Sequence, residues 1–163
     1  CGTSTVFKVA APGDGSAMRA LLKFDVSTIP AGTILASASL VLNCSANSGT
    51  PTSTIHRILR SDWVESETTW NIYKTANNWT SAGAGSDGND YQASPKIASD
   101  YTFSGTGQQV IPFTLSEFNK YVDLTYSSAD MIIRSSLANG IDFSSLNHGT
   151  SNLRPFTRVT YYT

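Results

Sequence analysis

Residues 18–26 alternate between apolar and polar side chains, which is the pattern of a strand that buries one face. The apolar face consists of Met18, Ala20, Leu22, Phe24 and Val26. The opposite face carries the charged side chains of Arg19, Lys23 and Asp25. Leu21 is the one apolar exception on that charged face. Because Pro30 and Gly32 favour a turn, we expect the strand to end before them.

The next run shows the same alternation and predicts a second strand. Its apolar face consists of Ile34, Ala36, Ala38, Leu40 and Leu42. Its other face carries Ser37, Ser39 and Asn43, with Leu35 and Val41 as partial exceptions. Two successive strands that each bury one face predict an antiparallel sheet packed on a second sheet. We expect its core to contain Leu22, Phe24, Leu40 and Leu42.

Strand patterns and turn signals continue along the chain and predict an all-β fold. The predicted strands are Thr5–Val9, Arg19–Asp25, Ala36–Leu42, Thr54–Leu59, Ile97–Phe103, Gln109–Phe113, Met131–Ser135 and Thr157–Tyr162. Turn sequences separate several of them, as at Pro12–Gly15, Asn47–Gly49 and Asn139–Gly140. We therefore expect a single domain over residues 1–163, a two-sheet antiparallel β-sandwich of jelly-roll type.

One short helix is expected within this β fold. Thr114 and Glu117 have the spacing of a capping box, in which each side chain binds the other residue's backbone N–H. Leu115, Phe118 and Val122 then fall on one helical face. This spacing predicts an amphipathic helix that begins after Thr114.

Composition narrows the classes of partner. Only 14% of the 163 residues are charged, against about a quarter in an average protein. Nucleic acids and anionic membranes both need a basic patch, and the net charge is −1. No apolar run approaches the length of a membrane span, so we expect no membrane insertion. Abundant Ser, Thr, Asn and Gly favour a secreted, extracellular all-β domain.

Several long motifs resemble the DNRLRE-type domain, a family grouped with carbohydrate-binding modules of secreted bacterial proteins. The resemblance begins with LLKFDVSTIPAGTILASASLVL at residues 21–42 and continues with Trp63–Asn71, whose spacing is one residue longer than the family's. Trp79 with Gly83–Ala84, Phe143–Ser145 and Arg154–Tyr162 also fit it. The resemblance implies a sandwich fold and a polysaccharide ligand. It also makes Trp63 and Trp70 expected core residues.

The two cysteines, Cys1 and Cys44, leave three interpretations open. A disulfide between them would pin the N-terminal strand in an oxidising compartment. Alternatively they are independent thiols, with Cys44 buried as a small apolar side chain. A lipoprotein start at Cys1 is the third interpretation.

No catalytic constellation is recognisable, so we expect no enzyme activity. His56 and His148 lie far apart and belong to no zinc-binding spacing. Asp62, Glu65 and Glu67 cluster, and a glycosidase needs two carboxylates, but carboxylates beside a turn more often cap it or face solvent.

The loop around residue 88 is a candidate calcium site. Asp87, Asn89 and Asp90 place three oxygen-bearing side chains around a glycine, and calcium prefers such hard ligands. The run lacks the closing Glu of an EF-hand, and a plain polar turn is the alternative. A structural calcium ion is the one cofactor that we consider.

Aromatic residues in the long irregular segment from Trp70 to Pro95 are candidates for a sugar-stacking platform. Tyr73, Tyr91 and the neighbouring Tyr101 are the preferred ones, and Trp79 fits either a platform or the core. Our hypothesis is a non-catalytic, secreted module that attaches to polysaccharide. The alternative is a structural or adhesive subunit of a surface filament, surface layer or virion, which would self-assemble or attach to a larger protein.

Overall fold

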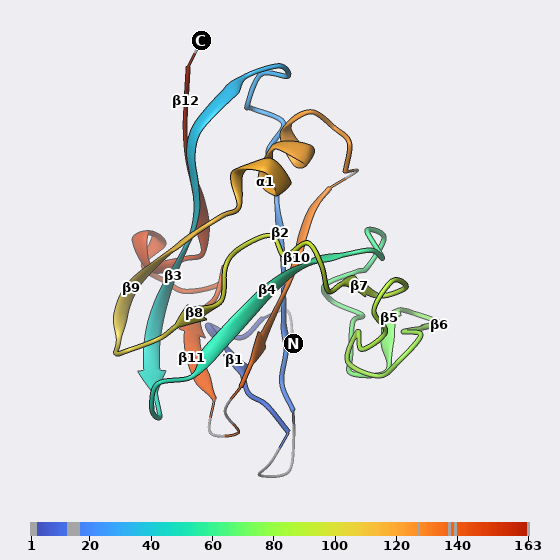
Figure 1. Ribbon diagram of the computed structural model, residues 1–163. Coiled ribbons are helices and arrows are strands. Elements are labelled where there is room, and N and C mark those ends of the chain that lie inside the picture. Colours follow the sequence, from blue (N-terminus) through green and yellow to red (C-terminus); the bar gives the residue numbers. More distant parts are fainter. Residues whose placement is uncertain (1–2, 13–16, 127, 137, 139, 163) are drawn as a thin grey trace.

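Two antiparallel sheets face each other in the computed structural model, which describes residues 3–12, 17–126, 128–136, 138 and 140–162 (Figure 1). The first sheet contains β1 (Val6–Val9), β11 (Ile141–Ser144), β3 (Ile34–Asn47), β12 (Phe156–Tyr162) and β9 (Gly107–Pro112). The second contains β2 (Ala20–Phe24), β10 (Ala129–Ser135), β4 (Thr52–Ile58), β7 (Tyr91–Gln92) and β8 (Tyr101–Thr102). This confirms the all-β, two-sheet fold, while the jelly-roll connectivity stays a prediction.

The main core lies between the two sheets. Leu40 and Leu42 of β3 are fully buried there, as predicted. Leu22 and Phe24 of β2 also pack against this core but remain partly exposed. The prediction for Met18 is wrong, because this side chain lies beyond the strand end and is 42% exposed.

The short helix α1 (Leu115–Val122) confirms the predicted helix and covers one end of the core. Phe118 and Val122 are buried as expected, and the Phe118 ring stacks on Phe113 with centroids 4.6 Å apart. The capping box does not form, since the Thr114 side chain makes no cap hydrogen bond. The Glu117 carboxylate instead accepts hydrogen bonds from Lys120 and from the Tyr126 hydroxyl.

Two parts of the chain differ from the predicted strands. Within Ile97–Phe103 only Tyr101–Thr102 is a strand, because Ile97 and Ala98 are buried without continuous pairing along one partner. The strand β11 was not predicted, although Phe143 is part of the core. A small hairpin of β5 (Ile72–Lys74) and β6 (Asn77–Asn78) and the 3-10 turn η1 (Ser151–Leu153) complete the described elements.

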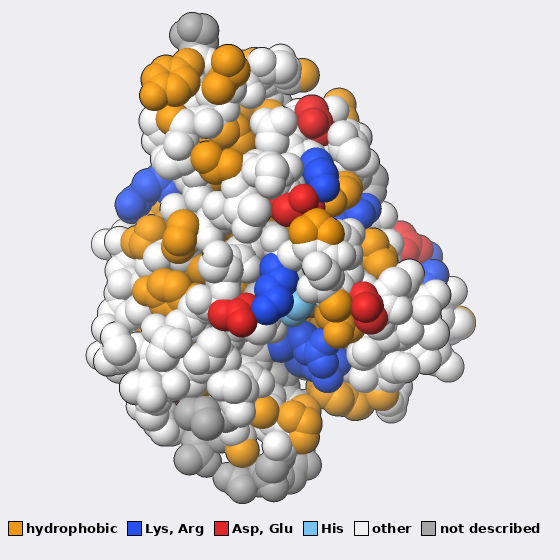
Figure 2. Space-filling model, viewed as in Figure 1, with side chains coloured by type: hydrophobic (Ala, Val, Ile, Leu, Met, Phe, Trp, Pro, Cys, Tyr) orange, Lys and Arg blue, Asp and Glu red, His pale blue; other side chains and the backbone are white. Residues whose placement is uncertain are grey.

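Exposed apolar side chains occur near the C-terminal end of β12 and over β9 on the face shown in Figure 2. Ile34 and Tyr162, which are paired between β3 and β12, are 71% and 68% exposed. Val110 of β9 is 39% exposed. Scattered exposure of this kind is ordinary for a protein surface.

Candidate functional site

A second hydrophobic cluster lies on the outer face of the second sheet, where residues 59–95 cover it. We call residues 59–95 the lobe. The cluster consists of Ile58, Trp63, Tyr73, Trp79, Ala84 and Ile132. Leu21 packs against this cluster, which explains the apolar residue on the charged face of β2. Trp63 is buried, as the resemblance implied. The second sheet therefore buries apolar side chains on both faces.

The buried carboxylate of Asp90 holds the lobe together. It accepts hydrogen bonds from the backbone N–H groups of Thr80 at 2.8 Å, Ser81 at 2.9 Å and Ser86 at 3.1 Å. The Arg60 Nε atom lies 3.9 Å away. Burial alone would raise the pKa of Asp90, but the three backbone donors outweigh it and hold the pKa below its ordinary value.

The other two predicted calcium ligands also bind within the loop. Asp87 accepts a hydrogen bond from the backbone N–H of Ala93 at 2.8 Å, and Asn89 donates to the Ser86 hydroxyl at 3.1 Å. Among the described residues no group of three or more His, Cys, Asp or Glu side chains is placed to hold a metal ion. The observed partners give Asp87, Asn89 and Asp90 a role in shaping the loop, and calcium binding stays a prediction.

Two of the aromatic candidates are buried in the second cluster. Tyr73 is 9% exposed and Trp79 is 5% exposed, with ring centroids 5.4 Å apart. The Trp79 indole N–H donates to the Thr69 carbonyl at 3.1 Å. The expectation that Tyr73 is an accessible loop ring is therefore wrong, because the lobe folds into a small core rather than a mobile loop. Both rings are largely covered.

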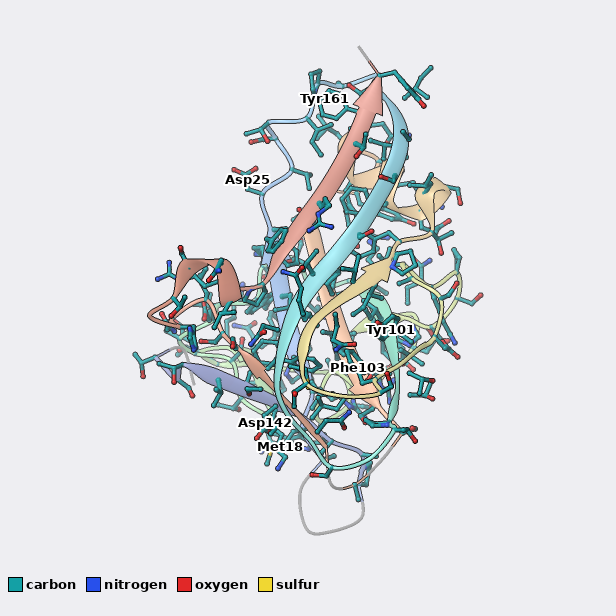
Figure 3. All side chains as sticks on the ribbon, turned by 90° about the vertical axis from the view of Figure 1, so that its left-hand side faces the viewer. Met18, Asp25, Tyr101, Phe103, Asp142 and Tyr161 are labelled. Carbon is teal, nitrogen blue, oxygen red and sulfur yellow. The ribbon has the colours of Figure 1, made fainter. Side chains whose placement is uncertain are left out.

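Tyr91 and Tyr101 are half-buried and lie in different places. Tyr91 lies between the Arg134 guanidinium, 4.7 Å from its ring centroid, and the His56 ring, 5.2 Å away. Tyr101 lies beside Phe103 near β9, and its hydroxyl donates to the Gln109 side chain at 3.2 Å (Figure 3). The structure thus does not gather the four aromatic candidates into one platform.

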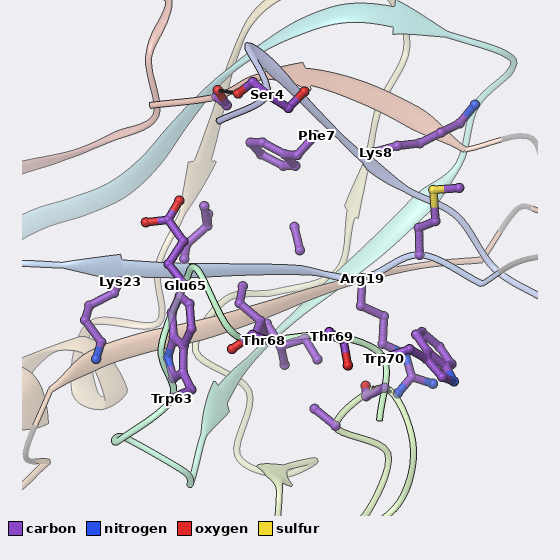
Figure 4. A pocket seen from close by; sticks show the side chains of 18 of the residues that line it. Ser4, Phe7, Lys8, Arg19, Lys23, Trp63, Glu65, Thr68, Thr69 and Trp70 are labelled. Atoms are coloured by element: carbon purple, nitrogen blue, oxygen red, sulfur yellow. Dashed lines mark hydrogen bonds between the residues drawn. The ribbon is translucent and has the colours of Figure 1, made fainter. Parts of the chain in front are cut away.

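A groove of about 540 Å³ runs along the free edge of β2. Every residue from Ala17 to Phe24 lines it, and Phe7 and Lys8 of β1 form the opposite wall (Figure 4). Each of these edge strands pairs on one side only, so the groove separates the open edges of the two sheets. The loop that carries Glu65 and Trp70 also lines the groove, as do residues 145–147.

Trp70 lies at one end of this groove and is 40% exposed, which corrects its assignment to the core. Gly83 supports the ring, because a Cβ atom added there would lie 2.5 to 2.7 Å from three ring carbons. Gly83 also donates its N–H to the Trp70 carbonyl at 2.5 Å. The Arg19 guanidinium lies 5.1 Å from the Trp70 ring centroid and donates to the Gly83 carbonyl at 2.5 Å. The exposed ring is therefore packed on Gly83 and Arg19.

At the opposite end of the groove, the buried carboxylate of Asp130 links Trp63 and Lys23 to the second sheet. Asp130 accepts a hydrogen bond from the Trp63 indole N–H at 3.0 Å, and the Lys23 ammonium lies 3.4 Å from the same carboxylate. Lys23 also donates to the Ser61 carbonyl at 3.0 Å. Figure 4 shows Trp63 and Lys23 at one end and Trp70 with Arg19 at the other. Lys23 is thus paired with an acid, whereas the contacts of the Arg19 guanidinium within the described part of the chain are the Gly83 carbonyl and the Trp70 ring.

Asp62, Glu65 and Glu67 are not arranged as the two catalytic carboxylates of a glycosidase. Asp62 binds Lys74 at 2.5 Å, and this hydrogen bond lowers the pKa of Asp62. Glu67 accepts the backbone N–H of Thr75 at 2.7 Å, which lowers the pKa of Glu67. Neither group has the raised pKa of a general acid. Glu65 is exposed on the groove rim without an ion pair among the described residues.

Cys44 is buried in the main core, has no disulfide partner among the described residues, and places its Sγ atom 3.5 Å from the Ala46 carbonyl. Burial raises the pKa of this thiol. Cys1 lies outside the described residues, so the disulfide and the lipoprotein start both stay predictions.

The family model of carbohydrate-binding module family 96 matches residues 1–137. No curated protein matches the chain. Within the described ranges, none of the helices has the length and hydropathy that a lipid bilayer requires of a spanning segment.

Proposed function

The chain belongs to carbohydrate-binding module family 96, and from this premise we propose that the groove along β2 binds a glycan chain without cleaving it. The single observation that carries this location is Trp70, a half-exposed ring fixed on the groove rim by Gly83 and Arg19. A rigid ring presents contact area to a sugar at little entropic cost.

The shape of the groove suits an extended ligand. It runs beside a whole edge strand, whose outward N–H and C=O groups are available to sugar hydroxyls. Lys8, Glu65 and Arg19 place charged hydrogen-bonding groups along the same rim. A mostly apolar groove with a few polar groups is the usual form of a ligand site.

The lowered pKa values of Asp62 and Glu67 favour a non-catalytic module. Modules of this kind are typically extracellular, which supports a secreted protein. The motifs at residues 21–42 and Trp63–Asn71 support the DNRLRE-type assignment. Family membership gives no support to the structural-subunit alternative.

The test is a Trp70→Ala variant, compared with the native protein on a glycan array and in pull-downs with insoluble polysaccharides. Loss of one stacked ring should weaken binding by roughly 2- to 10-fold. Tyr162→Ala is the matched control, because Tyr162 is 68% exposed at the far end of the first sheet. Circular dichroism and melting curves check that both variants fold.

Gly83→Ala provides a second, independent perturbation of the same ring. Its methyl group collides with Trp70, and its φ of 73° is strained for alanine, so binding should fall without removal of the ring. Native binding that survives in folded Trp70→Ala at full strength would place the site elsewhere. A native protein that binds no glycan at all would refute the carbohydrate-binding proposal.

A further inference from the structure

Met18 places a thioether in the wall of the groove. Its side chain is 42% exposed and lines the groove, as do Phe7 and Lys8 of the opposite wall (Figure 4). The Met18 N–H donates to the Ala10 carbonyl and the Ala10 N–H donates to the Met18 carbonyl, each at 2.9 Å. This bridge joins the chain just after β1 to the chain just before β2. The backbone of Met18 is therefore fixed, while its side chain lies at the groove surface.

The chain contains two methionines, and they differ greatly in exposure. Met131 of β10 is 0% exposed and belongs to the main core between the two sheets. Within the second sheet it is paired with Leu22 of β2 on one side and with Arg57 of β4 on the other. A small solute reaches Met131 only when the sandwich opens, whereas it reaches Met18 in the native fold. The protein thus has one accessible and one protected thioether.

Met18 contributes to an apolar surface of the groove. Val6, Leu146 and Trp70 line the same groove, and each of these side chains is also exposed. The fold gains little from a long apolar side chain that stays so exposed, so the contact area of Met18 is available to a ligand. A thioether is flexible and polarizable and adapts to an irregular partner. A change in the chemistry of this sulfur would therefore act on the groove rather than on the core.

We propose that Met18 is a site of reversible oxidation to methionine sulfoxide by hydrogen peroxide, and that this oxidation weakens glycan binding. The Met18 sulfur attacks one peroxide oxygen, and the O–O bond breaks as the S–O bond forms. The sulfur loses two electrons and the peroxide gains them. The departing hydroxide takes the proton of the transferred oxygen and leaves as water. The effect on binding rests on the proposed function, whereas the oxidation itself does not.

The physical effect of the added oxygen is local. A sulfoxide turns a flexible apolar side chain into a polar one whose oxygen is hydrated in the open groove. A glycan that covers this oxygen must displace its water, and the apolar contact of the thioether is lost. We expect binding to weaken by about 3- to 10-fold. The melting temperature should not change, because the bridge to Ala10 uses backbone atoms and the Met18 side chain lies outside the core.

The test treats the folded protein with dilute hydrogen peroxide, locates each added oxygen by peptide mass mapping, and measures polysaccharide binding before and after treatment. We expect Met18 to be oxidised at least about tenfold faster than Met131. Met18→Leu and Met131→Leu are the matched variants, since leucine has a similar volume and no sulfur. Peroxide should weaken binding by Met131→Leu as it does in the native protein. Binding by Met18→Leu should be the same before and after treatment.

Reversal separates this sulfur from the nearby indole of Trp70. The two stereospecific methionine sulfoxide reductases, used together, should remove the oxygen from Met18 and restore native binding. These enzymes do not repair oxidised tryptophan, so a loss that persists after complete reduction of Met18 would assign the effect to another residue and overturn the proposal.

Oxidation of Met18 no faster than that of Met131 would overturn the modification site. Unchanged or tighter binding by protein oxidised at Met18, or an equal loss in Met18→Leu, would refute its effect on the groove and leave carbohydrate binding intact. If the untreated native protein binds no glycan, the proposed function fails, and peptide mapping still tests the oxidation site alone.

Discussion

Replacement of Asp90 by Asn tests how strongly one buried carboxylate holds the lobe. In the native protein Oδ1 accepts from Thr80 and Oδ2 accepts from both Ser81 and Ser86. Asn has one acceptor oxygen and one NH₂ group. Whichever way its amide turns, at least one backbone N–H then faces another donor. The variant therefore keeps the shape of the side chain and loses part of its hydrogen bonding.

The expected loss in the free energy of unfolding follows from these contacts. A hydrogen bond to a charged group contributes about 1.5–3 kcal/mol, and the three together set a gross value of about 5–9 kcal/mol. The native protein also pays several kcal/mol to bury the carboxylate, and Asn retains one or two of the bonds. We therefore expect Asp90→Asn to lower the free energy of unfolding by about 2–4 kcal/mol at pH 7.

Urea unfolding followed by tryptophan fluorescence and by circular dichroism measures this loss. Asp100→Asn is the control, since its carboxylate forms an exposed ion pair with Lys96 that contributes at most about 1 kcal/mol. Gly83 lies in the turn between Ser81 and Ser86, so Asp90→Asn should also loosen Trp70 and weaken glycan binding.

The same carboxylate makes stability depend on pH. Its folded-state pKa is lowered, so its contribution is complete above the unfolded value of about 4 and is lost as the pH falls through the folded value. The difference between the native protein and Asp90→Asn should therefore shrink below about pH 4. A loss at pH 7 no larger than that of Asp100→Asn would refute this account of the lobe.

Two further predictions concern stability. Leu42→Ala, at a fully buried site, should lower the free energy of unfolding by about 3–5 kcal/mol. Phe24→Ala, at a partly exposed site, should lower it clearly less, and equal shifts in the urea midpoint would contradict the burial assigned to β2. Leu124 follows α1 with a φ of 63° and is 73% exposed, so Leu124→Gly should raise the free energy of unfolding by about 0.5–1 kcal/mol. Leu124→Ala keeps the strained backbone and should show no such gain.

Local patterns in the sequence were sufficient for much of the fold. A strand exposes alternate residues to opposite faces, so the repeat at Ala38, Leu40 and Leu42 identified the buried side of β3. The helical spacing of Phe118 and Val122 located α1 in the same way. Family motifs then indicated carbohydrate binding, and they correctly placed Trp63 in a core.

Local sequence patterns did not predict the surroundings of residues whose neighbours come from distant parts of the chain. Leu21 breaks the alternation of β2, and only the lobe folded over the second sheet explains it. Trp70 carries the same motif signal as Trp63, yet Gly83 and Arg19 hold it at the surface. Tyr73 lies in a segment that looked like a loop and is buried by the same lobe.

The sequence by itself therefore determined the two-sheet class, the faces of the main strands and the family, because these depend on neighbours a few residues away. Only the tertiary structure decided the groove and its exposed ring. Each of these depends on strand order and register between segments that are far apart in the chain. Such long-range pairing leaves no periodic trace in either segment, so no local pattern could reveal it.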